Sequence, residues 1–156
     1  MPEQRLARVE LPAGPPLRSA FAEADRHQAV RDLVMKNRFD PKGVDKGPYV
    51  LHLSIRDGRM VFDIRDLDDQ KLRVVALALG PFRRLVKDYH MVVEAHEQAV
   101  TESGPESRVQ AIDMGRRGLH NEAAELLAER LEAHVAVDFE TARRLFTLVC
   151  ALHQRI

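Results

Sequence analysis

Two runs of alternating hydrophobic and polar residues, 49–56 and 59–65, lie on either side of Asp57-Gly58. Strict alternation is typical of strands with one buried face, and Asp-Gly favours a two-residue type I′ turn, so the pattern predicts a β-hairpin. If Arg56 lies opposite Arg59, one face of the hairpin is hydrophobic and the other is mostly polar. The predicted buried face carries Leu51, Leu53, Ile55, Met60, Phe62 and Ile64.

Four further segments complete the first half of the chain. Residues 5–11 predict a short edge strand, and the proline-rich stretch after them cannot join a regular sheet. Hydrophobic residues recur at helical spacing over residues 20–37, which predicts the first helix. Residues 40–48 contain proline and glycine and predict a loop. Residues 72–79 are hydrophobic on both faces, which predicts a third strand in the middle of the sheet.

The second half of the chain is predicted to be helical. Pro81 occupies the favoured first position of a helix, and the break at Ser103-Gly104-Pro105 ends it. The last helix begins after Asp138, whose side chain is suited to cap it. Hydrophobic residues cover more than half of the circumference of this last helix, so we expect it to be deeply buried.

These elements define an α+β fold. We expect a small antiparallel sheet of three or four strands, built on the hairpin at residues 49–65, to pack against four or five helices. A chain of 156 residues fits one compact domain, which we assign to residues 19–156. Residues 1–18 then form an N-terminal arm or edge strand with its proline-rich linker.

Composition limits the possible partners. The chain has 24 basic and 24 acidic residues, so its formal net charge is zero and any contact with a polyanion requires a local patch. A single cysteine, Cys150, excludes an internal disulfide and favours the reducing cytoplasm. We find no targeting signal and no apolar run of about 18 residues, so the protein is expected to be soluble and to make no membrane contact.

Three arginine pairs, Arg83-Arg84, Arg116-Arg117 and Arg143-Arg144, lie in or just before the opening turns of predicted helices. Cations at these positions oppose the helix dipole, and the free backbone N–H groups there favour anions. The arginine pairs therefore indicate a negative partner, either a carboxylate of the same protein or an external anion.

The strongest candidate site is the segment from Gly115 to Gly118. Two glycines three residues apart predict a break between a helix at 106–114 and another that runs to about residue 133, with Asn121 as its N-cap. In this arrangement the glycines allow close approach of the backbone, and two guanidinium groups grip a phosphate or carboxylate. The predicted ligand-binding residues are Gly115, Arg116, Arg117, Gly118, His120, Asn121, Arg83 and Arg84.

Each arginine pair also has a purely structural interpretation. The helix can run straight through Gly115 and Gly118, with Arg116 and Arg117 paired to Asp113 or Glu122. Arg83 and Arg84 can pair with Asp63, Asp66 or Asp88, and such exposed pairs contribute little. Glu140 and Arg144 have the (i, i+4) spacing of a helical ion pair.

A catalytic alternative rests on the predicted polar face of the hairpin. The register places His52 opposite Asp63, and a carboxylate beside an imidazole can raise its pKa and orient a general base. Ser54 lies on the same face, but a Gly-x-Ser-x-Gly motif is absent. Cross-strand charge pairs also stabilise sheets without any catalysis.

The histidines do not predict a metal site. His90, Glu94 and Glu97 can meet on one helix, but no second helix offers a matching set of ligands. His96 and His153 lie in hydrophobic stripes, where a hydrogen-bonded core histidine is the usual occupant. We therefore predict no metal and no cofactor.

Four motifs carry a resemblance to a known family. They are VFDIRD at residues 61–66, PFRRLVKDY at 81–89, AIDMGRRGLHNE at 111–122 and DFETARRLFTLVCALH at 138–153. Together they resemble an uncharacterised protein family of alphaproteobacteria over about residues 20 to 155. The resemblance implies a small cytoplasmic bacterial protein. It supplies no catalytic residues, so the functional interpretation rests on the residues themselves.

The residues support three functional hypotheses. The first is a non-catalytic binding module whose arginine site holds a phosphorylated small molecule or an acidic protein segment. The second is a protein-interaction or structural subunit, in which the open sheet face and the edge at residues 5–11 recruit another chain or form a homodimer. The third is a small hydrolase or transferase that uses His52 and Asp63. Nucleic acid remains an alternative partner, although most aromatic residues lie at predicted core positions.

Overall fold

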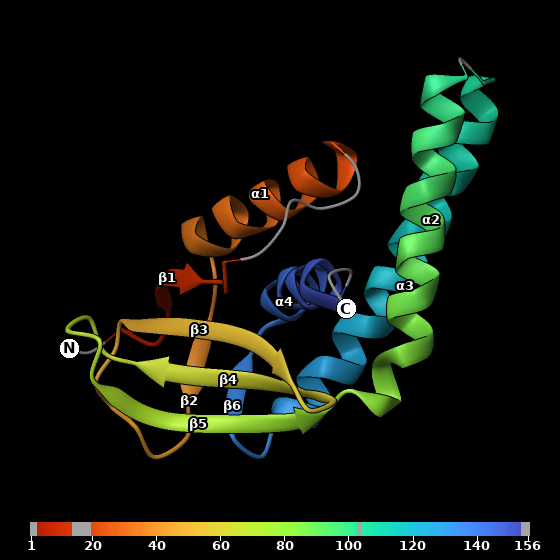
Figure 1. Ribbon diagram of the computed structural model, residues 1–156. Helices are drawn as coiled ribbons and strands as arrows, with labels where there is room; N and C mark the ends of the chain where they lie inside the picture. The colour runs from red at the N-terminus through yellow and green to blue at the C-terminus, as the bar shows by residue number, and fades with distance from the viewer. Residues whose placement is uncertain (1–2, 14–19, 103, 154–156) are drawn as a thin grey trace.

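The computed structural model describes residues 3–13, 20–102 and 104–153, and shows an α+β fold with one four-stranded and one two-stranded sheet (Figure 1). The elements are β1 (Leu6–Glu10), α1 (Ala20–Met35), β2 (Phe39–Pro41), β3 (Tyr49–Arg56), β4 (Arg59–Arg65), β5 (Lys71–Ala78), the 3-10 turn η1 (Gly80–Phe82), α2 (Arg83–Thr101), α3 (Glu106–Leu131), β6 (Val135–Val137) and α4 (Phe139–His153).

The predicted hairpin is confirmed with its register. Strands β3 and β4 are antiparallel, and Arg56 pairs with Arg59 across the turn. Asp57 and Gly58 both have positive φ, at 53° and 71°, as a type I′ turn requires. Alternate side chains of both strands point into the core. The buried set on this face includes Leu51, Leu53, Met60, Phe62 and Ile64.

The larger sheet has the order β1-β3-β4-β5. The predicted edge strand at residues 5–11 is confirmed as β1, although it runs parallel to β3, which makes the sheet mixed. Two adjacent parallel strands need a long crossover connection, and the segment containing α1 provides it between β1 and β3. The proline-rich linker predicted after residue 11 lies largely in 14–19, outside the described residues.

The predicted central position of β5 is wrong. This strand pairs only with β4 and forms the edge of the sheet opposite β1. Its side chains alternate between the core, where Val75 is 3% exposed, and the surface, where Val74 is 55% exposed. The prediction was wrong because the outward residues of β5 are apolar but exposed, so an apolar run did not mean that both faces are buried.

Helix α4 is the centre of the helical layer. It packs against α1, α2, α3 and β3, and it is buried over most of its length as predicted. Asp138 accepts a hydrogen bond from the backbone N–H of Thr141 at 2.8 Å and caps the helix. Figure 1 shows α4 between the inner face of the larger sheet and α1.

The smaller sheet was not predicted. Strand β2 lies at the start of the stretch expected to be a loop, and it pairs antiparallel with β6, with Phe39 opposite Val137. Phe39 is fully buried. Strands of three residues are too short to show an alternating pattern, so only the tertiary pairing of segments nearly 100 residues apart reveals them.

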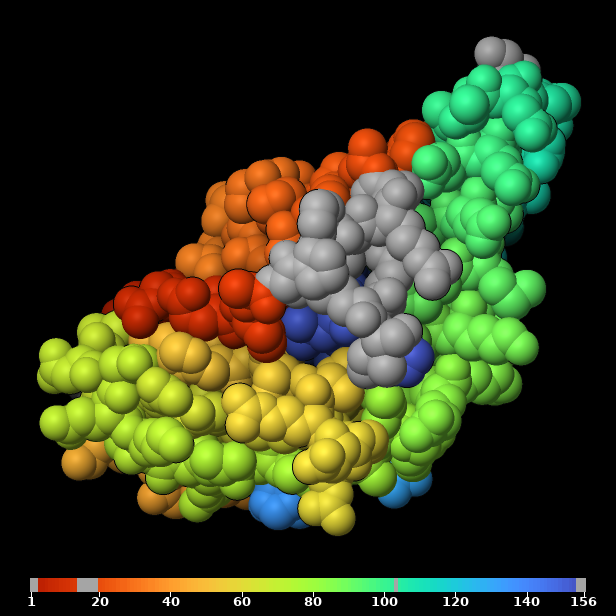
Figure 2. Space-filling model, in the orientation of Figure 1, coloured from red at the N-terminus to blue at the C-terminus, as the bar shows by residue number. Residues whose placement is uncertain are grey.

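The predicted break at Gly115 and Gly118 is also wrong. Helix α3 continues from Glu106 to Leu131, so Asn121 lies inside a helix and caps nothing. A glycine in a helix costs only about 1 kcal/mol relative to alanine, and packing of α3 against α2 and α4 outweighs that cost. The predicted break near residue 103 is confirmed, since α2 ends at Thr101. Figures 1 and 2 show that α2 and α3 form a hairpin projecting from the rest of the molecule.

Candidate functional site

The outward face of the larger sheet carries most of the polar chemistry brought together by the fold. His52, Ser54 and Arg56 point outward from β3, and the register places Asp63, Val61 and Arg59 opposite them on β4. Glu10 of β1 is the neighbour of His52 on the other side. No helix among the described residues covers this face in Figure 1.

A hollow of about 360 Å³ lies on this face. Residues after β1 form one wall, and the outward side chains of β3, β4 and β5 form the floor. The residues that line it are Glu10, Leu11, Pro12, His52, Leu53, Ser54, Arg56, Val61, Asp63, Arg65, Lys71 and Val74. Small-molecule sites commonly have volumes of about 300 to 1,000 Å³, so the hollow is large enough for a small ligand.

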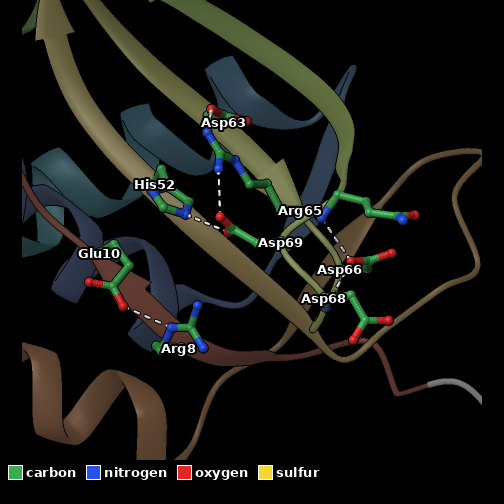
Figure 3. Close-up of polar contacts among 9 residues, drawn as sticks. Arg8, Glu10, His52, Asp63, Arg65, Asp66, Asp68 and Asp69 are labelled. Carbon is green, nitrogen blue, oxygen red and sulfur yellow. Dashed lines mark hydrogen bonds and ion pairs between the residues drawn. The ribbon is translucent and has the colours of Figure 1, made fainter.

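A chain of polar contacts, drawn in Figure 3, joins the lining residues Asp63, Arg65 and His52 through Asp69. The guanidinium of Arg65 contacts two carboxylates: one of its nitrogens lies 2.8 Å from Asp69, and a second nitrogen lies 2.8 Å from Asp63. The Nε2 atom of His52 lies 2.9 Å from the other oxygen of Asp69. These contacts raise the pKa of Arg65, chiefly through Asp63, and lower the pKa of Asp69, chiefly through the hydrogen bond with His52.

The predicted pair of His52 and Asp63 is only half correct. The two residues are opposite each other in the register, as expected, but the imidazole bonds to Asp69 instead. Asp63 is directed to Arg65, and its Oδ1 atom is buried without a hydrogen-bond partner among the described residues. The sheet face therefore does not show the acid–base dyad that the sequence suggested.

Asp69 was missed because its position depends on a turn. Asp66 accepts hydrogen bonds from the backbone N–H groups of Asp68 and Gln70, at 2.9 and 3.0 Å. Asp69 then adopts a positive φ of 64°, which aspartate tolerates better than most residues. This turn directs the Asp69 carboxylate back over the sheet, and the sequence signal was the aspartate-rich composition of the turn.

The cations of the hollow differ in how they are neutralised. Arg65 has two carboxylate partners, and Glu10 is paired with Arg8 at 2.7 Å. Arg56 and Lys71 also line the hollow, and neither forms an ion pair with any other described residue. The hollow therefore offers two uncommitted positive charges, while its acidic residues are already paired.

The arginines of the predicted helix-terminal site lie elsewhere. Arg116 is 3.7 Å from Asp113 on the same helix, and Arg117 is exposed. Gly115 and Gly118 face open space, since a Cβ atom at either position would meet nothing within 4 Å. The helix N-terminus that was to supply N–H donors does not exist, because α3 is continuous here.

The other arginine pairs are largely matched by carboxylates. Arg84 contacts Glu122 at 2.5 Å and Asp88 at 3.3 Å, which joins the start of α2 to α3 and raises the pKa of Arg84. Arg144 lies 3.6 Å from Glu140, the predicted (i, i+4) pair, and Arg143 lies 3.5 Å from the same carboxylate. Most of these arginines follow the structural interpretation.

His120, predicted as a ligand-binding residue, is a core residue only 5% exposed. Its Nδ1 atom lies 3.0 Å from the carbonyl oxygen of Arg116, and its Nε2 atom lies 3.2 Å from the hydroxyl of Thr147. A carbonyl only accepts, so Nδ1 carries the proton, and the one hydroxyl proton of Thr147 is shared between Nε2 and the carbonyl oxygen of Arg143, which lies 3.3 Å away. Burial, and next the charge of Arg143, lower the pKa of His120 to about 4.

Other buried polar groups surround His120 between the helices. Tyr89 of α2 donates a hydrogen bond to Asp25 of α1, and its ring packs edge-on against His120 and Phe146. Burial, together with Asp25, raises the pKa of Tyr89. His153 stacks on His90, while His96 is half-buried near Asp113. Among the described residues, no group of three or more His, Cys, Asp or Glu side chains is placed to hold a metal.

The fold and this surface define a small α+β protein with an open, charged sheet face and a projecting helical hairpin. Over residues 3–155 the chain matches the Uncharacterised protein family (UPF0262), and it belongs to that family. In the parts of the chain that are described, no helix has the length and apolar character needed to cross a membrane.

Curated relatives from alphaproteobacteria support the assignment. A UPF0262 protein of Granulibacter bethesdensis is 60% identical over 146 residues, which cover 88% of this chain and 82% of that protein. A UPF0262 protein of Acidiphilium cryptum is 55% identical, and the match covers 88% of this chain and 84% of that protein. One from Paramagnetospirillum magneticum is 49% identical and covers 97% of both chains. No solved structure matches the chain.

Proposed function

We propose that the protein is a non-catalytic binding module that holds a phosphate-bearing small molecule in the hollow of its open sheet face. The observation that carries this proposal is the pair of uncommitted cations, Arg56 and Lys71, in a concave site whose acidic residues are already paired. The strand register places Arg56 beside the β3–β4 turn and Lys71 at the other end of the sheet, so each cation can bind a different anionic group of the ligand.

The remaining lining residues suit the rest of such a ligand. Leu11, Pro12, Val61 and Val74 contribute apolar surface, against which an uncharged part of the ligand can pack. Ser54 can donate a hydrogen bond. The Asp69 carboxylate fixes His52 at the end of the hollow, so the imidazole has a defined orientation toward the ligand.

Binding is favoured over hydrolysis by the arrangement of the polar groups. The imidazole of His52 is directed to Asp69, and among the described residues no hydrogen bond joins it to Ser54. A serine nucleophile requires a base within hydrogen-bond reach and donors for the oxyanion. The sheet face supplies neither feature around Ser54.

Titration calorimetry and thermal shift with inorganic phosphate, pyrophosphate and nucleotides test the proposal. Saturation at about 100 times the dissociation constant stabilises a protein by about 2.7 kcal/mol, which thermal shift detects. We expect at least one probe to bind, and we expect the double variant Arg56→Gln/Lys71→Gln to lose that binding without unfolding. Absence of binding by every probe would contradict the proposal.

Two control variants locate the site. Arg59→Gln/Lys87→Gln removes the same charge, but neither residue lines the hollow, so binding should persist. Arg116→Gln/Arg117→Gln removes the arginine pair that the sequence favoured, and it should also leave binding intact. Loss of binding only in this last variant would move the ligand site from the sheet face to α3.

A further inference from the structure

Strand β5 is a long edge strand without a partner on one side. It has eight residues, its principal neighbour is β4, and no other described strand pairs with it. In Figure 1 it forms the side of the sheet opposite β1 and α1. An edge of this length presents a row of backbone N–H and C=O groups that can pair with another strand.

The opposite edge of the sheet, formed by β1, is less suited to pairing with another strand. Strand β1 has only five residues, its pairing with β3 includes a register shift, and its outward side chains Arg8 and Glu10 form an ion pair. Short length, irregular pairing and charge are features that protect an edge against further pairing. On β5 the irregularity and the charged residues, Lys71 and Arg73, lie near its beginning, and residues 74–78 are uncharged.

The uncharged part of β5 is also exposed. Val74 is 55% exposed, and it is the single strand residue among the large exposed hydrophobic residues of the described chain. Ala76 and Ala78 lie beside it on the same outward face and are exposed as well. Pairing of this segment with another strand would cover apolar surface in addition to satisfying backbone groups.

The sequence of β5 is compatible with its own antiparallel copy. Opposite residues in an antiparallel pair lie on the same face, so a two-fold axis must pass through a residue position, and an axis at Val74 or Val75 in the middle of β5 pairs the most residues. An axis at Val74 places Arg73 opposite Val75, and an axis at Val75 places Arg73 opposite Leu77. Lys71 and Arg73 therefore never face another cation in either register, which removes the usual like-charge penalty.

We propose that β5 pairs antiparallel with β5 of a second copy of this chain, so that two four-stranded sheets form one continuous eight-stranded sheet. The two-fold axis stands perpendicular to the sheet, and both outward faces, with their hollows, lie on the same side of the dimer. The interface uses the backbone edge and residues 74–78, of which Val74 also lines the hollow, and its test by molecular mass requires no ligand.

Light scattering coupled to size-exclusion chromatography tests the interface over a range of concentrations. The mass of the wild-type protein should rise from 17.7 kDa toward twice that value. The variant Val74→Glu/Ala76→Glu places carboxylates opposite each other with the axis at either residue, so it should stay monomeric. A wild-type protein that remains monomeric at every concentration would overturn the proposal.

The matched control places the same charges on the projecting hairpin. Met91 and Met114 are 58% and 69% exposed on α2 and α3, so Met91→Glu/Met114→Glu adds two carboxylates at another exposed apolar surface. This variant should still dimerise. Dimerisation that is lost here and retained in the β5 variant would assign the interface to the helical hairpin and overturn the proposal.

Hydrogen exchange of the wild-type protein gives a second measurement that needs no variant. Outward N–H groups of β5 should exchange more slowly at high protein concentration than at low concentration, because the second copy protects them. Exchange of the outward N–H groups of β1 should not depend on protein concentration. Concentration-independent exchange along β5 in a sample that is dimeric by light scattering would exclude this edge as the interface.

Discussion

The imidazole of His52 and the carboxylate of Asp69 are joined at 2.9 Å, although the residues lie 17 positions apart and on different elements. His52 belongs to β3, while Asp69 belongs to the turn between β4 and β5. Asp69 also contacts Arg65, so one carboxylate binds two side chains that line the hollow. The placement of the His52 and Arg65 side chains therefore depends on a single turn residue.

Removing the charge of Asp69 should strengthen anion binding. Asn tolerates the positive φ of this position, so Asp69→Asn keeps the turn while releasing Arg65 and His52 from a competing carboxylate. We expect tighter phosphate binding by calorimetry and little change in stability, because the pair is exposed. Asp68→Asn, one residue away and without contact to His52, is the control. Weaker binding by Asp69→Asn than by this control would refute the prediction.

Acid should destabilise the fold through His120. Its pKa is lowered to about 4 in the folded protein, against about 6.5 when unfolded, so the unfolded state binds the extra proton first. The contribution of His120 is complete above pH 6.5 and decreases by about 3 kcal/mol as the pH falls toward 4. His153, whose pKa is also lowered by burial, acts in the same direction.

Urea denaturation at several pH values measures this effect. The variant His120→Gln should reduce the dependence of the unfolding free energy on pH between 6.5 and 4, whatever its effect at neutral pH. His27→Gln, at an exposed histidine on α1, is the control variant. Equal slopes for wild type and His120→Gln would show that the buried imidazole does not titrate in this way.

Alanine in place of the two glycines of α3 should stabilise the protein. Gly115 and Gly118 lie inside a helix with open space around the missing Cβ, so Gly115→Ala and Gly118→Ala should each add up to about 1 kcal/mol to the free energy of unfolding. Gly58→Ala is the contrasting variant, because φ at Gly58 is +71° and alanine there should destabilise the hairpin. Denaturant melts distinguish these outcomes. Destabilisation by the α3 variants would mean that the helix is broken there after all.

Loss of the Asn37 side chain should weaken the junction of α1 and β1. Its amide accepts a hydrogen bond from Leu6 N–H at 2.7 Å and donates to the carbonyl oxygens of Leu6 and Leu33. Asn37→Ala leaves these backbone groups without a partner and should cost about 1 to 3 kcal/mol. Lys36→Ala, at an exposed neighbour, should cost much less. Similar midpoints for the two variants in urea would contradict the assigned role.

The candidate site could be predicted only in part. His52, Ser54 and Asp63 were placed on one face because strand alternation and the turn set the register locally. Arg56 follows from the same register. Lys71 and Asp69 were missed, because their places depend on the turn after β4 and on the pairing of β5 with β4.

The sequence by itself determined the local structure of this protein: the hairpin at Asp57-Gly58, its register, the limits of α2 marked by Pro81 and Gly104-Pro105, and the α+β class. These features depend on turn conformation and on the period of hydrophobic residues over a few positions. The family resemblance was likewise carried by short motifs of the chain.

Only the tertiary structure decided which strand lies at the edge and whether α3 is continuous. Both outcomes depend on packing between distant segments: β1 occupies the side of β3 away from β4, and α2 and α4 hold α3 together across Gly115 and Gly118. The same packing buries His120, a candidate ligand residue, in the core, and it leaves one edge of β5 without a partner strand among the described residues. Local propensities of about 1 kcal/mol per residue are smaller than the contribution of such contacts, because packing supplies most of the stability of a helix in a protein.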